Sequence, residues 1–121
     1  MPTVTGIGGF FFRAKDPEAL AAWYKTHFGI LPVPSDYESP VWQQQAGPTV
    51  FAPFPEDTDY FGPAENQWML NLRVTDLDAA ITALEEGGIQ VTRWSEELPN
   101  GRFAHLFDSE GNRIELWEPK A

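Results

Sequence analysis

The sequence contains no cysteine. A disulfide framework, a thiolate nucleophile and a cysteine-ligated metal site are therefore excluded. Long hydrophobic runs are also missing, because no stretch of the 121 residues is apolar for long enough to span a bilayer. The N-terminus has no basic segment followed by an apolar run, as a signal peptide would have. We therefore expect a cytoplasmic protein.

Positive charge is scarce. The chain has 8 Lys and Arg residues against 18 Asp and Glu residues, which gives a formal net charge of −10 at pH 7. Proteins that bind nucleic acid or anionic membranes need basic surfaces, so we expect neither partner. A small-molecule pocket is compatible with this charge. The apolar content of 42% and the aromatic content of 14% argue against disorder, and the length suits one compact domain.

The chain carries an internal repeat. FFFRAKDPEALAAWY and LNLRVTDLDAAITAL each contain a strand-like run, an arginine, a helix-capping aspartate and an apolar helix, and the two aspartates, Asp16 and Asp76, lie 60 positions apart. We predict one domain of two modules, at about residues 5–54 and 67–119, joined by a linker at about residues 55–66. Two such halves can place their helices outside a shared curved sheet, and the inside of the curve becomes a cavity. The expected fold class is α+β.

Local signals place the elements of each half. Aspartate followed by proline and an acid begins a helix, glycine ends one, and a cluster of Asp, Gly and Asn closes a hairpin. The expected elements are a strand over Ile7–Ala14, a helix from Asp16 to Gly29, short strands over Val41–Gln45 and Thr49–Pro53, a strand over Trp68–Val74, a helix from Asp76 to Gly87, a strand over Ile89–Trp94, and a hairpin of Gly101–Phe107 with Arg113–Trp117.

Glu115 lies in the middle of the last expected strand. Because side chains alternate along a strand, it shares a face with Arg113 and Trp117. A carboxylate in such a position is costly if it is buried and unpaired. It is therefore solvated, paired with an arginine (Arg13, Arg73 or Arg113), or part of a site.

The facing of His105 depends on the register of the hairpin. Pairing of Phe107 with Arg113 would place His105 opposite Glu115, whereas a shift by one residue would place Leu106 there. A histidine–glutamate pair could perform acid–base chemistry, so both residues are candidate catalytic groups. A single strand histidine is more often a surface or ligand-contact residue.

Three segments carry a family resemblance: FFFRAKDPEALAAWYKTHFGI, FAPFPEDTDYFGP and DSEGNRIELWEP. With them, essentially the whole chain resembles the vicinal oxygen chelate superfamily, which includes glyoxalase I, extradiol dioxygenases, and bleomycin- and fosfomycin-resistance proteins. The resemblance implies two tandem βαβββ modules that form a cupped mixed sheet with helices on the convex side. It also implies a homodimer.

The resemblance implies a test for metal binding. Metal-dependent members carry His, Gln or Glu about seven residues before each capping aspartate, where this chain has Gly9 and Met69. The acid of the final strand is present as Glu115, but Thr49–Phe54, where the remaining ligand would fall, contains no acid or histidine. One ligand of four does not hold a divalent ion. We predict no cofactor, the alternative being a divalent metal (Zn, Ni, Fe or Mn).

Residues on the concave face form the candidate ligand site. If Gly9 and Met69 mark that face, three Arg, one Asn and one Glu converge among aromatic side chains, which suits a small organic molecule with a polar or anionic group. Trp42 and Phe51 are either core aromatics or stacking platforms. The candidate ligand-binding residues are Phe11, Arg13, Trp42, Phe51, Met69, Asn71, Arg73, Arg113 and Trp117.

The predicted function follows from these residues. We expect a glyoxalase/bleomycin-resistance-like protein that binds a small organic molecule in the sheet cavity without metal. The alternative is a glyoxalase-like lyase or related enzyme that uses Glu115, with or without a divalent metal, so enzymatic activity stays open. A module that keeps the fold only for dimerisation would not need converging polar groups.

Overall fold

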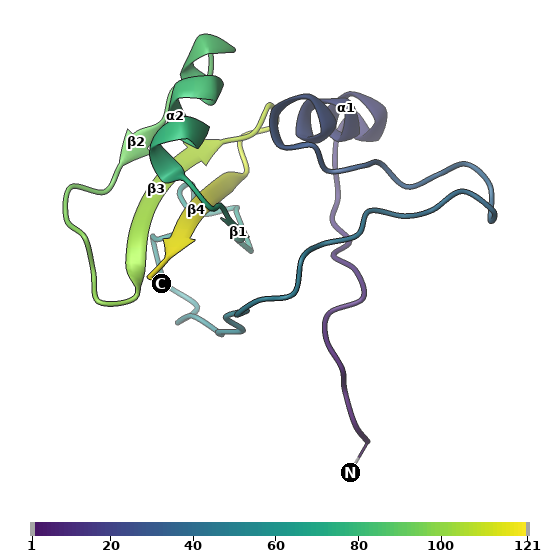
Figure 1. Ribbon diagram of the computed structural model, residues 1–121, viewed down its shortest axis with the longest axis horizontal. Helices are drawn as coiled ribbons and strands as arrows, with labels where there is room; N and C mark the ends of the chain where they lie inside the picture. The colour runs from purple at the N-terminus through teal and green to yellow at the C-terminus, as the bar shows by residue number, and fades with distance from the viewer. Residues whose placement is uncertain (1, 121) are drawn as a thin grey trace.

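The computed structural model describes residues 2–120 and has a mixed α+β architecture, so the predicted fold class is confirmed (Figure 1). Its elements are α1 (Pro17–Phe28), β1 (Leu70–Arg73), α2 (Leu77–Glu86), β2 (Thr92–Arg93), β3 (Gly101–Phe107) and β4 (Arg113–Pro119). Within residues 2–120, no helix is long and apolar enough to cross a membrane.

The four strands form one mixed sheet in the order β1-β4-β3-β2. β1 runs parallel to β4, while β3 is antiparallel to both β4 and β2. The second half of the chain is therefore a complete βαβββ module, as predicted. Figure 1 shows α2 lying against one face of this sheet.

Both helices begin at the aspartates of the repeat. Asp16 accepts a hydrogen bond from the Ala19 backbone N–H at 3.1 Å, and Asp76 accepts one from Ala79 at 3.0 Å. Each cap satisfies an N–H that the helix itself cannot, which contributes about 1 kcal/mol. Gly29 ends α1 with a φ of 69°, a left-handed conformation that glycine adopts without steric cost.

The core lies between the helices and one face of the sheet. Its fully buried side chains are Leu77 of α2, Leu106 of β3, and Ile114 and Leu116 of β4. Because successive side chains along a strand point to opposite faces, Glu115, which lies between Ile114 and Leu116, points away from the core. The helices thus occupy one face and leave the other for a cavity.

The tip of the β3–β4 hairpin holds α1 in place. Asp108 accepts a hydrogen bond from the hydroxyl of Tyr24 at 2.7 Å, and both residues are buried. The Glu110 carboxylate accepts the backbone N–H groups of Lys15 at 2.7 Å and Asp16 at 2.9 Å, just before the helix. The first helix is therefore attached to the second module through polar contacts as well as through the core.

The three strands predicted for the first half are not formed. Ile7–Ala14, Val41–Gln45 and Thr49–Pro53 make no strand pairing, and Figure 1 draws them as irregular chain outside the sheet. Ile7–Ala14 has phenylalanines on both faces, a pattern that favours a strand only when both faces are covered. Here only one face is partly covered: Phe10 and Phe12 pack against Trp68, whereas Phe11 on the other face is 93% exposed.

Candidate ligand-binding site

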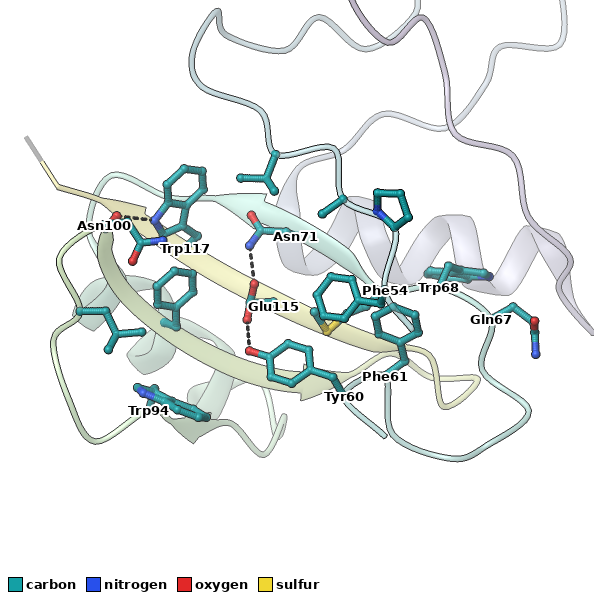
Figure 2. A pocket seen from close by; sticks show the side chains of 16 residues that line it. Phe54, Tyr60, Phe61, Gln67, Trp68, Asn71, Trp94, Asn100, Glu115 and Trp117 are labelled. Carbon is teal, nitrogen blue, oxygen red and sulfur yellow. Dashed lines mark hydrogen bonds between the residues drawn. The ribbon is translucent and has the colours of Figure 1, made fainter. Parts of the chain in front are cut away.

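A cavity of about 520 Å³ lies on the sheet face opposite α2 (Figure 2). Its floor comes from β1, β3 and β4, and its walls come from residues 50, 52–54, 60–61, 67–69, 94, 98 and 100. Seven aromatic side chains line it: Phe54, Tyr60, Phe61, Trp68, Trp94, Phe103 and Trp117.

Glu115 lies at the centre of the floor and is only 8% exposed. Strand register places Asn71 of β1 on one side of it and His105 of β3 on the other. Asn71 Nδ2 donates to Glu115 Oε1 at 2.7 Å, and His105 Nε2 lies 2.9 Å from Oε2. The Tyr60 hydroxyl donates to the same Oε2 at 2.6 Å, as Figure 2 shows.

These hydrogen bonds decide the charge of Glu115. Burial raises the pKa of its carboxyl, but hydrogen bonds from His105, Tyr60 and Asn71 outweigh burial and hold the pKa below its usual range. The group is therefore ionised at neutral pH and only accepts hydrogen bonds. It follows that His105 donates from Nε2. Three of about four acceptor positions on the carboxylate are filled, and one remains on Oε1.

Tyr60 comes from the linker and not from the sheet. Burial, followed by the hydrogen bond to the anionic Glu115, raises the pKa of its hydroxyl, so it stays protonated and donates. Arg113 Nη1 donates to the Tyr60 backbone carbonyl at 2.9 Å, and its guanidinium lies 5.5 Å from the centre of the Tyr60 ring. Asn66 Nδ2 donates to the carbonyl of Gly111 at 3.1 Å. The linker is thus held against β4 and the hairpin turn.

Aromatic rings line much of the cavity, in its floor and in its walls. Phe103 and Trp117 occupy paired positions on β3 and β4, and their rings are parallel within 3°, with centroids 6.2 Å apart. The Trp117 indole N–H donates to the Asn100 carbonyl at 2.8 Å, which fixes the ring. Phe54 stacks on Tyr60 with centroids 5.8 Å apart. Flat apolar faces therefore surround the single acid.

The structure brings four of the predicted site residues to the cavity: Met69, Asn71, Glu115 and Trp117. His105 is buried on the same sheet face as Glu115, against the rings of Tyr60 and Trp94, because the hairpin pairs Phe107 with Arg113. Of the two registers considered from the sequence, the first is therefore correct.

The remaining predicted residues do not line the cavity: Phe11, Arg13, Trp42, Phe51, Arg73 and Arg113. Arg73 Nη2 donates to the Gln45 carbonyl at 2.8 Å, and Arg113 turns to Tyr60. The proposed salt bridge from Glu115 to an arginine is wrong, because neutral donors and His105 satisfy the carboxylate instead. Sequence reasoning missed Tyr60, whose only signal was an aromatic pair in a polar linker.

The side chains around Glu115 do not fit a divalent metal. Across residues 2–120, no three His, Asp or Glu side chains cluster closely enough to hold an ion. Both Glu115 oxygens already accept hydrogen bonds, and His105 directs Nε2 at Glu115. Zinc, nickel and iron sites need three or four such donors around one point.

Solved structures share this fold. A member of the glyoxalase/bleomycin resistance protein/dioxygenase superfamily from Sphaerobacter thermophilus is 23% identical over 87% of this chain and 90% of that one, with a TM-score of 0.56. A putative glyoxalase family protein from Bacillus anthracis is 20% identical over 85% of this chain and 84% of its own, with a TM-score of 0.52.

A shorter match has higher identity. TnmS3, an antibiotic binding protein from Streptomyces sp. CB03234, is 39% identical, with a TM-score of 0.39. That match covers 42% of this chain and 41% of TnmS3, so it spans less than half of either protein. No curated protein matches the chain. The family model of the glyoxalase-like domain matches residues 9–117, almost the whole chain. The chain therefore belongs to the glyoxalase-like domain family, within the vicinal oxygen chelate superfamily.

Proposed function

We propose that this protein binds a small organic molecule in the sheet cavity and does so without a metal ion. The observation that carries the proposal is an aromatic cavity of about 520 Å³ with one buried acid at its centre. Ligand pockets typically measure about 300–1,000 Å³ and combine apolar walls with a few fixed polar groups. Glu115 and Asn71 supply those polar groups here.

Binding is favoured over catalysis by the state of the polar groups. A general base works best when its pKa lies near the working pH, whereas the pKa of Glu115 lies below its usual range. Tyr60 has a raised pKa and is a correspondingly weak acid. Both groups are suited to orienting a ligand.

The second candidate is a glyoxalase-like lyase or related enzyme that uses Glu115, with or without a divalent metal. The contact of 2.9 Å between His105 and Glu115 favours it, because such a pair can relay a proton. It ranks second because His105 is buried against the rings of Tyr60 and Trp94 and does not line the cavity.

The protein used for the test is dialysed against a chelator, analysed for metal by mass spectrometry, and titrated with small aromatic molecules. We expect metal far below one equivalent per chain and one ligand site per chain. Stoichiometric zinc or nickel, together with turnover of methylglyoxal and glutathione, would reverse the ranking of the two candidates.

We further propose that the protein is a homodimer. The first half exposes large apolar side chains, among them Val4, Phe11, Val33, Val50 and Phe51. Apolar surface of this extent normally marks an interaction site, and a second copy of the chain would cover it. Light scattering should give about 27 kDa, twice the 13.6 kDa of one chain. A mass of one chain at micromolar concentration would refute the dimer. The cytoplasmic location stays a prediction.

A further inference from the structure

We infer that the cavity selects a planar aromatic molecule that carries a positive charge and an N–H donor, and that it discriminates against anions. The inference rests on the proposed function and specifies the class of ligand. It differs from the sequence-based expectation of a polar or anionic group, because that expectation placed arginines in the cavity.

The charges that face the cavity are of one sign. Among residues 2–120, Glu115 is the single charged side chain that lines it. Arg113 lies behind Tyr60, with Nη1 bonded to a carbonyl, and Arg73 reaches out to Gln45. An anionic group entering this space would lose water without meeting a cation, and it would approach a carboxylate.

The acid has room for one more donor. Oε2 of Glu115 already accepts from Tyr60 and His105, while Oε1 accepts only from Asn71. A carboxylate offers about four acceptor positions, so one position on Oε1 is left for a ligand. A charged N–H group would form the stronger, charge-assisted type of hydrogen bond there.

The cavity walls favour the same class of ligand. The faces of aromatic rings carry partial negative charge and attract cations, with tryptophan the strongest. Trp94, Phe103 and Trp117 line the cavity together with Glu115, and their flat rings suit a planar ring system. The net charge of −10 adds a field that draws cations toward the protein.

The test uses three probes of equal ring size and different charge. 9-Aminoacridine is a cation with N–H donors, acridine is neutral, and acridine-9-carboxylate is an anion. Isothermal titration calorimetry should show one site per chain. The cation should bind at least about tenfold more tightly than the neutral ring, a difference of about 1.4 kcal/mol. The anion should bind most weakly.

Two results would contradict the account in different ways. If the anion bound as tightly as the cation, the ligand class would be wrong while small-molecule binding stood. If none of the three rings bound, the proposed function would fail, and the inference would fail with it.

Substitutions in the cavity test whether the preference for the cation arises there. Glu115→Gln should remove most of the preference for the cation while neutral acridine still binds. Because Glu115→Gln also disturbs a buried network, Asn100→Lys provides a second test with Glu115 intact. Asn100 lines the cavity beside Trp117 and is exposed, so the added charge should lower the cation-to-anion affinity ratio by about threefold or more.

The matched control is Gln90→Lys. Gln90 is exposed and does not line the cavity, and the substitution changes the net charge by the same amount. We expect the affinity ratio to stay within about twofold of the unmodified protein. An equal effect of Asn100→Lys and Gln90→Lys would mean that the acidic surface, and not the cavity, attracts the cation.

Discussion

Glu115 is a buried acid whose charge is stabilised by hydrogen-bond donors from three separate parts of the chain. Tyr60 belongs to the linker, Asn71 to β1 and His105 to β3. Loss of any one of these donors would reduce the stabilisation of the Glu115 charge, because water has little access to the carboxylate. At the scale of single residues, therefore, the site depends on this network.

Tyr60→Phe should remove one donor while keeping the ring. We expect the pKa of Glu115 to rise, because one of the hydrogen bonds that lower it is lost. The free energy of unfolding should fall by about 1.5 kcal/mol, as for other hydrogen bonds to a charged group. Carbon-detected NMR titration of the Glu115 carboxyl and urea denaturation measure the two effects.

The control for this variant is Tyr37→Phe, since Tyr37 is fully exposed and makes no such contact. Tyr37→Phe should leave both quantities unchanged. An unchanged Glu115 pKa in Tyr60→Phe would show that the hydrogen bond between these two residues does not stabilise the charge.

The charge of Glu115 also makes stability depend on pH. Its folded-state pKa lies below the ordinary value of 4.5, so its stabilising contribution is present above that value and is lost as pH falls through the folded-state pKa. The difference in unfolding free energy between the unmodified protein and Glu115→Gln should therefore shrink between about pH 5 and pH 2. A difference that stays constant over this range would show that Glu115 gains no charge-dependent stability.

At the scale of elements, the β3–β4 hairpin organises the molecule. Its side chains on one face line the cavity, and those on the other face form part of the core. Its turn accepts hydrogen bonds from the backbone just before α1. Gly101, the first residue of β3, has a φ of 134°. A Cβ at this position would overlap the Glu118 carbonyl oxygen and lie 2.8 Å from the Trp117 indole nitrogen.

Gly101→Ala should therefore destabilise the hairpin where it borders the cavity. We expect a loss of about 1–3 kcal/mol in unfolding free energy, together with weaker ligand binding through displacement of Trp117. Thermal and urea unfolding provide the measurement. Gly8→Ala is the control, because no atom lies within 4 Å of a Cβ there. Equal stability of Gly101→Ala and Gly8→Ala would contradict this assignment.

How well sequence predicted these elements depends on how local their signals are. Each helix start rests on Asp16 or Asp76 and the three residues after it, so both starts were predicted correctly. The hairpin was also predicted, because its turn residues Asp108–Asn112 are a local signal, but the sequence left two registers open and the structure has the one that pairs His105 with Glu115. The hydrogen bonds that Asp108 accepts within the turn all come from these five consecutive residues.

Predictions of structure that depends on residues far apart in the sequence were less accurate. A strand exists only when another strand pairs with it, and Ile7–Ala14 has no partner in this structure. The contact between Tyr60 and Glu115 joins residues 55 positions apart, and nothing in the linker sequence specifies it. Arg73 and Arg113 lie on the expected strands, but long side chains can turn to nearby carbonyls, as both do.

At the scale of the whole molecule, the two halves of the repeat differ. The second half forms an open four-stranded sheet with a core on one face, and the first half contributes α1 to that core and leaves much of its irregular segments exposed. The floor of the cavity belongs to the second half, and part of its wall comes from residues 50 and 52–54 of the first half. The glyoxalase-like family match over residues 9–117 covers both halves.

The most direct test of a metal-free ligand site is an NMR titration of chelator-treated protein with 9-aminoacridine. The account predicts that the Asn71 side-chain amide and the Trp117 indole N–H shift with a single affinity, while the indole of Trp23 on α1 does not move. It would be contradicted if these signals stayed still, or if they shifted only after a divalent metal was added.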